Sequence, residues 1–180
     1  LNNSQPSSIK GAYMDLNTER EIVNGGSLIS NAIKNKVNIN SGSFAKVNIS
    51  GAEANVVWHI NIDPAQKETW GDAITLTVKN NEININGGSF NEEDNEIIGA
   101  RVYAGQENAT QDNKPVQVTV ENNMVKISNA SFVVKGEWNN IIGGDGSGRC
   151  SISDYQTSGN AIATGNVTVD LKNNAVEFVN

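Results

Sequence analysis

The side chains most often used in catalysis are scarce in this chain. Its 180 residues include one His and one Cys, which are His59 and Cys150. His59 lies in Val56-Val-Trp-His-Ile-Asn-Ile62, an alternating segment typical of a strand, and no Gly-x-Ser-x-Gly turn accompanies it. Cys150 follows a run of glycines and has no second Cys with which to form a disulfide. The sequence therefore predicts a strand residue and a small turn residue, not a catalytic base and a nucleophile.

Two further segments contain residue types that bind ions. The segment Gly143-Gly-Asp-Gly-Ser-Gly-Arg-Cys-Ser151 partly matches the calcium-binding nonapeptide of β-rolls, but Gly148 stands where that repeat has an Asp ligand. The same glycines are not followed by Lys-Ser or Lys-Thr, as a phosphate-binding loop requires. The acidic run Glu92-Glu-Asp94 is typical of a solvated loop and lacks the ligand spacing of a calcium site. We therefore expect neither a metal nor a cofactor.

Charge and composition exclude several classes of function. The chain has 13 basic and 20 acidic residues, so its net charge of −7 repels nucleic acid and anionic lipid. No apolar run approaches the roughly 18 residues of a membrane helix, so we expect no membrane insertion by this segment. Residues 1–8 contain no visible targeting signal, and a start at Leu indicates a processed or excised piece. About one residue in six is Asn, which favours many tight turns between short strands.

Two short motifs repeat along the chain with a period of about 45 residues. The first begins with an apolar and a charged residue, continues through Asn and an alternating segment, and closes on Ser-Phe. Its four copies are Ile33–Phe44 (without the spacer residue of the others), Val78–Phe90, Val120–Phe132 and the incomplete Leu171–Asn180. The second motif is Ile49-Ser-Gly-Ala52, with copies at Ile97-Ile-Gly-Ala100 and Ile141-Ile-Gly-Gly144. Alternating, β-branched segments such as Ile74-Thr-Leu-Thr-Val78 then predict further strands.

This periodicity predicts an all-β, right-handed parallel β-helix. We expect each period to form two coils of some 20 to 24 residues, with equivalent residues stacked about 4.8 Å apart. Phe44, Phe90 and Phe132 would then form one inward column, and Asn35, Asn80, Asn122 and Asn173 would share one corner of alternate coils. The alternative is an antiparallel β-sandwich, in which Asn80-Asn81 and Asn122-Asn123 are hairpin turns. Residues 33–180 are expected to be repeats, and residues 1–32 a cap or a degenerate coil.

The repeats resemble those of a known family of secreted proteins. The closest stretch is Asn160-Ala-Ile-Ala-Thr-Gly-Asn-Val-Thr-Val169, together with Ala109-Thr110 and Asn113 in the copy before. These residues resemble the repeats in the passenger domains of bacterial autotransporters, which use type V secretion. The resemblance implies a β-helical stalk outside a Gram-negative cell, often an adhesin, and it supplies no catalytic residues.

The segments that vary between copies point to a binding surface. The distance to the next Asn corner is 29 residues from Gly51, 23 from Gly99 and 30 from Gly143. A solenoid ejects such extra residues as loops, where aromatic and polar side chains are favoured for contact with proteins or glycans. We expect residues 53–72 to be the main contact surface. The candidate binding residues are Trp58, His59, Trp70, Arg149 and Tyr155.

The expected function is that of a secreted or cell-surface adhesin or stalk, without enzymatic activity, which binds a protein or glycan on a host or neighbouring cell. One alternative is a β-helical polysaccharide lyase or hydrolase, which needs two carboxyl groups about 5 to 10 Å apart. The aspartates do not recur at equivalent repeat positions; they are Asp63, Asp72, Asp112, Asp145, Asp154 and Asp170. The other alternative is a carbohydrate-binding or fimbrial-type β module.

Overall fold

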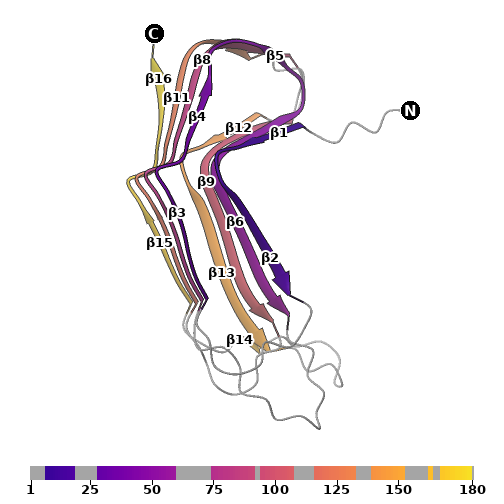
Figure 1. Cartoon of the computed structure of the whole chain (residues 1–180), viewed down its shortest axis with the longest axis vertical. Coiled ribbons are helices and arrows are strands. Elements are labelled where there is room, and N and C mark those ends of the chain that lie inside the picture. The colour runs from indigo at the N-terminus through magenta and orange to yellow at the C-terminus, as the bar shows by residue number, and fades with distance from the viewer. Residues whose placement is uncertain are drawn as a thin grey trace, which may run out of the picture.

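The computed structural model describes residues 7–18, 28–59, 74–91, 94–107, 116–132, 139–152, 162–163 and 167–179. Within these residues the secondary structure consists of strands, which form three sheets (Figure 1). The predicted all-β class is therefore confirmed.

Each sheet collects the strands that occupy the same place in successive repeats. Sheet A contains β1 (Ser7–Lys10), β2 (Tyr13–Thr18), β6 (Val47–His59), β9 (Asn95–Glu107), β12 (Asn139–Ile142), β13 (Asp145–Ile152) and β14 (Ile162–Ala163). Sheet B contains β3 (Leu28–Ile33), β7 (Ile74–Lys79), β10 (Val116–Glu121) and β15 (Val167–Lys172). Sheet C contains β4 (Lys36–Ile39), β5 (Ser43–Phe44), β8 (Glu82–Phe90), β11 (Met124–Phe132) and β16 (Ala175–Val179).

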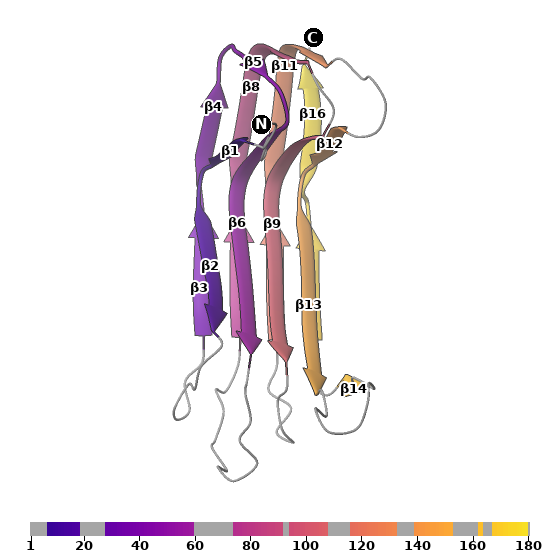
Figure 2. The same ribbon diagram turned by 90° about the vertical axis from the view of Figure 1, so that its right-hand side faces the viewer.

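The chain passes through the three sheets in turn and returns to the first one strand further along. Neighbouring strands are parallel in each of these sheets, apart from the pair β13–β14. In Figure 2 the strands of sheet A run downwards in front, those of sheet B run upwards behind, and successive coils move to the right. This sense of rotation is right-handed. The structure is thus the predicted right-handed parallel β-helix.

One expectation about the architecture was wrong, and the alternative fold is excluded. Ile49 pairs with Ile97 and Val78 with Val120, so one coil takes 48 or 42 residues, and each period forms one coil instead of two. The antiparallel sandwich is also excluded, because Asn80-Asn81 connects β7 in sheet B to β8 in sheet C and is not a hairpin turn. A period of about 45 residues is needed since each coil contains the long, bent strand of sheet A in addition to the strands of sheets B and C.

The apolar core has two parts, because each long strand of sheet A changes direction along its length (Figure 1). Its first half packs against sheet C, where Ile49, Ile83 and Phe90 are fully buried. Its second half packs against sheet B, where Ala52 and Leu76 are fully buried. The alternation read from the sequence therefore places every second side chain inside along much of these strands, whereas the adjacent residues Ile97 and Ile98 of β9 are both buried.

The predicted phenylalanine column is present in sheet C. Phe44 and Phe132 each pair in register with Phe90. The ring centroids of Phe44 and Phe90 are 5.0 Å apart, and those of Phe90 and Phe132 are 4.5 Å apart. Phe90 is completely buried between its neighbours. A stacked column of this kind gives a continuous core to a chain with few aromatic residues.

Two columns occupy the corner between sheets B and C. Asn80, Asn122 and Asn173 adopt left-handed backbone conformations, with φ between 51° and 56°. Asn tolerates this region better than most residues, which explains the recurrent Asn at the corner. Lys34 takes the equivalent position in the first coil, with φ of 61°. The expected place of Asn35 in this column was therefore wrong by one residue, because Ala32 aligns with Val78 and no spacer is missing.

The second column is a ladder of hydrogen-bonded side chains, here called the asparagine ladder: Asn35, Asn81, Asn123 and Asn174. In each inner coil the backbone N–H and the Nδ2 group donate to Oδ1 of the Asn in the next coil. The Nδ2 group also donates to a backbone carbonyl of the coil before, as from Asn123 to Val78 O at 3.1 Å. The side chains of Asn81 and Asn123 are buried with these bonds satisfied.

The glycine of the Gly-Ala motif packs directly on this ladder. A methyl group on Gly99 would overlap the carbonyl oxygen of Gly143 and lie 3.4 Å from Cβ of Asn123. Gly51 has the same environment one coil earlier, against the carbonyl of Gly99 and Cβ of Asn81. The motif is therefore explained by close approach of neighbouring coils.

The first described residues belong to the same sheets. Ile9 pairs with Ile49, and Tyr13 with Glu53, so strands β1 and β2 lie beside β6. Strand β3 pairs with β7 in sheet B. The predicted division of the chain into residues 1–32 and 33–180 stays a prediction.

Candidate functional site

The strands of sheet A end, and those of sheet B begin, along one edge of the solenoid, here called the loop edge (Figure 1). The last residues of the sheet A strands share register, since Thr18 pairs with Trp58, Trp58 with Gln106, and Gln106 with Cys150. The first residues of the sheet B strands are also in register; they are Leu28, Ile74, Val116 and Val167. Connections from four coils therefore start and end within rows about 4.8 Å apart.

The loop edge includes the backbone of three predicted binding residues. Trp58 and His59 are the last two residues of β6. Arg149 lies in β13 and pairs with Gly105, which itself pairs with Val57. Arg149 in β13 is therefore two strands away from the end of β6, and neighbouring strands are about 4.8 Å apart. The side chains of these three residues are outside the described part of the structure, as are Trp70 and Tyr155 altogether.

The outer face of sheet A has a group of charged and aromatic residues, here called the charged strip. One row across four coils consists of Tyr13, Glu53, Arg101 and Asp145. Beside this row, Lys10 Nζ lies 2.7 Å from Glu53 Oε2 and 3.8 Å from the centre of the Tyr13 ring. The hydroxyl of Tyr13 donates to Asp15 at 3.0 Å, and this bond raises the Tyr13 pKa.

Arg101 and Glu96 of β9 together join three coils at the centre of the charged strip. Its Nη2 donates to Glu96 Oε1 at 2.6 Å and its Nε donates to Asp145 Oδ2 at 3.2 Å. Asn48 of the preceding coil donates to the other oxygen of Glu96 at 3.2 Å. The bond with Glu96 raises the Arg101 pKa against the opposing effect of desolvation, and Asp145 adds to the rise. The strip therefore presents fixed carboxylate acceptors and a tyrosine ring that a polar ligand such as a glycan can contact.

Sequence reasoning missed the charged strip, although a signal for it was present. Tyr13, Glu53, Arg101 and Asp145 each stand two positions after the glycine of a Gly-Ala motif or its equivalent. Alignment on that glycine places them in one row.

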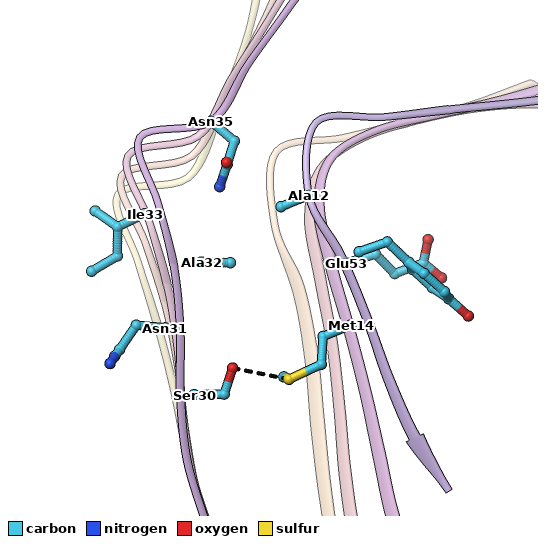
Figure 3. A pocket seen from close by; sticks show the side chains of 9 residues that line it. Ala12, Met14, Ser30, Asn31, Ala32, Ile33, Asn35 and Glu53 are labelled. Carbon is cyan, nitrogen blue, oxygen red and sulfur yellow. Dashed lines mark hydrogen bonds between the residues drawn. The ribbon is translucent and has the colours of Figure 1, made fainter.

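A hollow of about 250 Å³ opens at the N-terminal end of the solenoid, between β2 and β3. Ala12, Met14, Ser30 and Ala32 line it from the two strands (Figure 3). The Ser30 hydroxyl contacts the Met14 sulfur at 3.1 Å across the hollow. Asn31 and Ile33 also border the hollow, and their side chains lie on the opposite side of β3 from those of Ser30 and Ala32 (Figure 3).

Acidic residues were candidates for catalysis or for metal binding. Of the six aspartates compared above, Asp145 binds Arg101, and Asp170 binds Lys172 at 2.6 Å. The remaining four, at positions 63, 72, 112 and 154, lie outside the described residues, as does the 92–93 part of the acidic run. The described residues contain no group of three or more His, Cys, Asp or Glu close enough to hold a metal ion. They also contain no helix with the length and apolarity of a membrane span.

No protein-family model matches this chain, and neither the curated proteins nor the solved structures include a significantly similar one. The resemblance to autotransporter passengers stays a prediction.

Proposed function

We propose that this chain is part of a secreted or surface-exposed bacterial passenger protein, which acts as a stalk and adhesin. Its partner is a protein or glycan on a host or neighbouring cell, bound through the loop edge. The observation that supports this most strongly is the gathering of the sheet A to sheet B connections at one edge.

The corner between sheets B and C and the loop edge are under different constraints. At the corner between sheets B and C, the asparagine ladder requires an Asn side chain in every coil. Connections at the loop edge differ in length from coil to coil, and they are free of that requirement. A binding surface assembled from several loops on a rigid support is a common arrangement for recognition.

The stacked coils also supply what a stalk requires. Parallel hydrogen bonding between coils runs through all three sheets, and the phenylalanine column and the asparagine ladder follow the same axis. Such a solenoid holds loops at a fixed place and distance from one another.

Binding is tested with the purified chain on an array of mammalian and bacterial-surface glycans and on immobilised collagen, fibronectin and laminin. We expect saturable binding to at least one of these probes. Trp58→Ala and Trp70→Ala should each weaken it by about 30-fold or more, which corresponds to the 2 kcal/mol typical of a binding hot spot. Lys126→Ala, an exposed change on sheet C, is the matched control and should leave binding unchanged.

Three results would overturn the proposal. The first is the absence of binding to every probe, and the second is binding that both Trp variants leave intact at an unchanged melting temperature. The third is release of reducing ends or unsaturated sugars from an arrayed glycan, because that result favours the polysaccharide-active enzyme.

A further inference from the structure

Tyr103 stands on the outer face of sheet A in an inner coil, next to the charged strip. It follows Arg101 by two positions in β9, so both side chains lie on the same face of the sheet. The residues between and after them, Val102 and Ala104, are buried in the core shared with sheet B. Glu53 pairs with Arg101, and Figure 3 shows its side chain pointing away from sheet B.

This outer face is present whichever coils stand at the ends of the solenoid. Strand β6 lies between β9 and the pair β1 and β2, and β9 lies between β6 and β13. Side chains stand roughly perpendicular to a sheet, so a further coil at either end would lengthen the outer face without covering Tyr103. The surface is therefore a property of the repeats.

The Tyr103 side chain is half-buried and available to a ligand. Among the residues that the structure describes, it makes no hydrogen bond, and its ring makes no aromatic or cation contact. Its neighbours across the sheet are Asn55 and Ser147. The next position of β9 on the same face is Gly105, which has no side chain to cover the ring. The ring and its hydroxyl therefore offer both an apolar and a polar contact.

The charges beside the ring are paired with one another. Arg101 donates to Glu96 at 2.6 Å and to Asp145 at 3.2 Å, and Lys10 lies 2.7 Å from Glu53. The side chains of Arg101 and Asp145 are still 31 and 47% exposed, so their polar atoms are within reach of a ligand. The strip thus presents donors and acceptors held in place, without an excess of positive charge.

These features fit a neutral glycan better than other partners. The centre of a protein interface is apolar and depleted in charged residues, whereas the described outward side chains of β6 and β9 beyond the bend are polar, charged or aromatic. They are Glu53, Asn55, Arg101 and Tyr103. An anionic polysaccharide would meet the carboxylates of the strip and a chain of net charge −7. A neutral sugar has an apolar ring face and hydroxyl groups that match this surface.

We propose that the outer face of sheet A around Tyr103 binds a neutral glycan chain, which lies along the solenoid axis. One sugar ring packs on the Tyr103 ring. Hydroxyl groups of the chain donate to the carboxylates of Glu53 and Asp145, which belong to the strands on either side of β9 at a spacing of about 4.8 Å. This site goes beyond binding through the loop edge, and it occupies a different surface.

The test is isothermal titration calorimetry of the purified chain with cellohexaose, chitohexaose and mannohexaose. We expect at least one of these probes to bind, and to bind more tightly than its disaccharide, because three coils contribute contacts. Tyr103→Ala should weaken the binding by about 10-fold or more. Tyr103→Phe keeps the ring and should change it by less than about 3-fold. Gln117→Ala, an exposed change on sheet B, is the matched control and should bind like the wild type.

Ionic strength separates a neutral ligand from a charged one. Binding of the hexasaccharide should be unchanged between about 50 and 500 mM salt, since screening acts on charged partners. A heparin hexasaccharide should not compete for the site. Competition by heparin that disappears at high salt would overturn the proposal, because it would show that the surface recognises an anion.

The loop edge and the Tyr103 surface can fail separately in this test. A probe bound at Tyr103 should be unaffected by Trp58→Ala, and a probe bound at the loop edge should be unaffected by Tyr103→Ala. Absence of binding to all three neutral probes would overturn the proposal, as would binding that only Trp58→Ala removes.

A protein ligand at this surface would give a further distinct result. Loss of binding to immobilised collagen, fibronectin or laminin in Tyr103→Ala, without binding of any sugar, would mean that the surface recognises a protein and that the proposal is wrong. Circular dichroism verifies that each variant is folded. Tyr103→Thr, whose side chain favours strands, replaces Tyr103→Ala if the latter is unfolded.

Discussion

Replacement of Asn123 by Ala is expected to be among the most damaging single changes in this protein. The Asn123 side chain is completely buried. Its Nδ2 donates to Val78 O at 3.1 Å and to Asn174 Oδ1 at 2.9 Å. Its Oδ1 accepts from the backbone N–H and Nδ2 of Asn81, at 3.0 and 2.8 Å. The substitution therefore removes four hydrogen bonds and leaves a buried N–H and a buried carbonyl without these partners.

The expected loss of stability follows from these bonds. A typical intramolecular hydrogen bond contributes about 1 kcal/mol, and a buried polar group left unsatisfied costs about 1–3 kcal/mol. Partial entry of water into the space offsets some of this cost, so we expect a net loss of about 3–5 kcal/mol. For a chain of this size that loss corresponds to a fall of roughly 10 °C in melting temperature.

Urea and thermal denaturation, followed by far-ultraviolet circular dichroism, measure the effect. The matched control is Asn122→Gly at the adjacent residue, where φ is 55° and the side chain is exposed. Because Gly adopts this conformation freely, the control should change stability by less than about 0.5 kcal/mol. A loss below about 1 kcal/mol for Asn123→Ala, or an equal loss for the control, would refute the role assigned to the ladder.

Two further changes test the core and the surface charges. Phe90→Ala should cost about 3–5 kcal/mol because the ring is fully buried in its column; thermal denaturation measures it, and a loss below about 1 kcal/mol would contradict the stacking. Desolvation raises the Glu82 pKa, but bonds from Asn84 and Lys36 and the charge of Lys126 together lower it below its ordinary 4.5. The contribution of Glu82 to stability is thus complete above that value and is lost as the pH falls through the lowered pKa. Glu82→Gln should reduce the dependence of the unfolding free energy on acid pH, an effect smaller than about 1 kcal/mol. Urea denaturation of both proteins between pH 3 and 7 measures it, and the same pH dependence in both would contradict the assignment.

The fold could be predicted from the sequence because stacking repeats the same requirement in every coil. A column needs matching side chains, so Phe44, Phe90 and Phe132 recur at the coil length. The number of coils in each period could not be derived in the same way. Strand periodicity gives the alternation within each strand, whereas the extent of one coil depends on how far β6 and β9 continue past the bend.

The candidate site was less accessible to sequence reasoning. Differences in length between copies drew attention to the connections after β6 and β13, but length alone does not bring four coils to one edge. The charged strip could have been found, since Glu53, Arg101 and Asp145 hold the same position relative to the glycine motif. It was missed because their charges alternate in sign along the column, so no single residue type recurs.

The bend and the ladder together explain how the loop edge can vary without disturbing the fold. A methyl group on Gly51 or Gly99 would lie within 3.4 Å of Cβ of Asn81 or Asn123, so sheet A and the corner pack closely in these coils. A shift of register by one residue would bring a side chain into this contact and break the ladder. Register is therefore fixed in the middle of the coil, away from the loop edge (Figure 1). Residues inserted beyond the end of β6 leave that contact unchanged, so the length of the connection can differ from coil to coil.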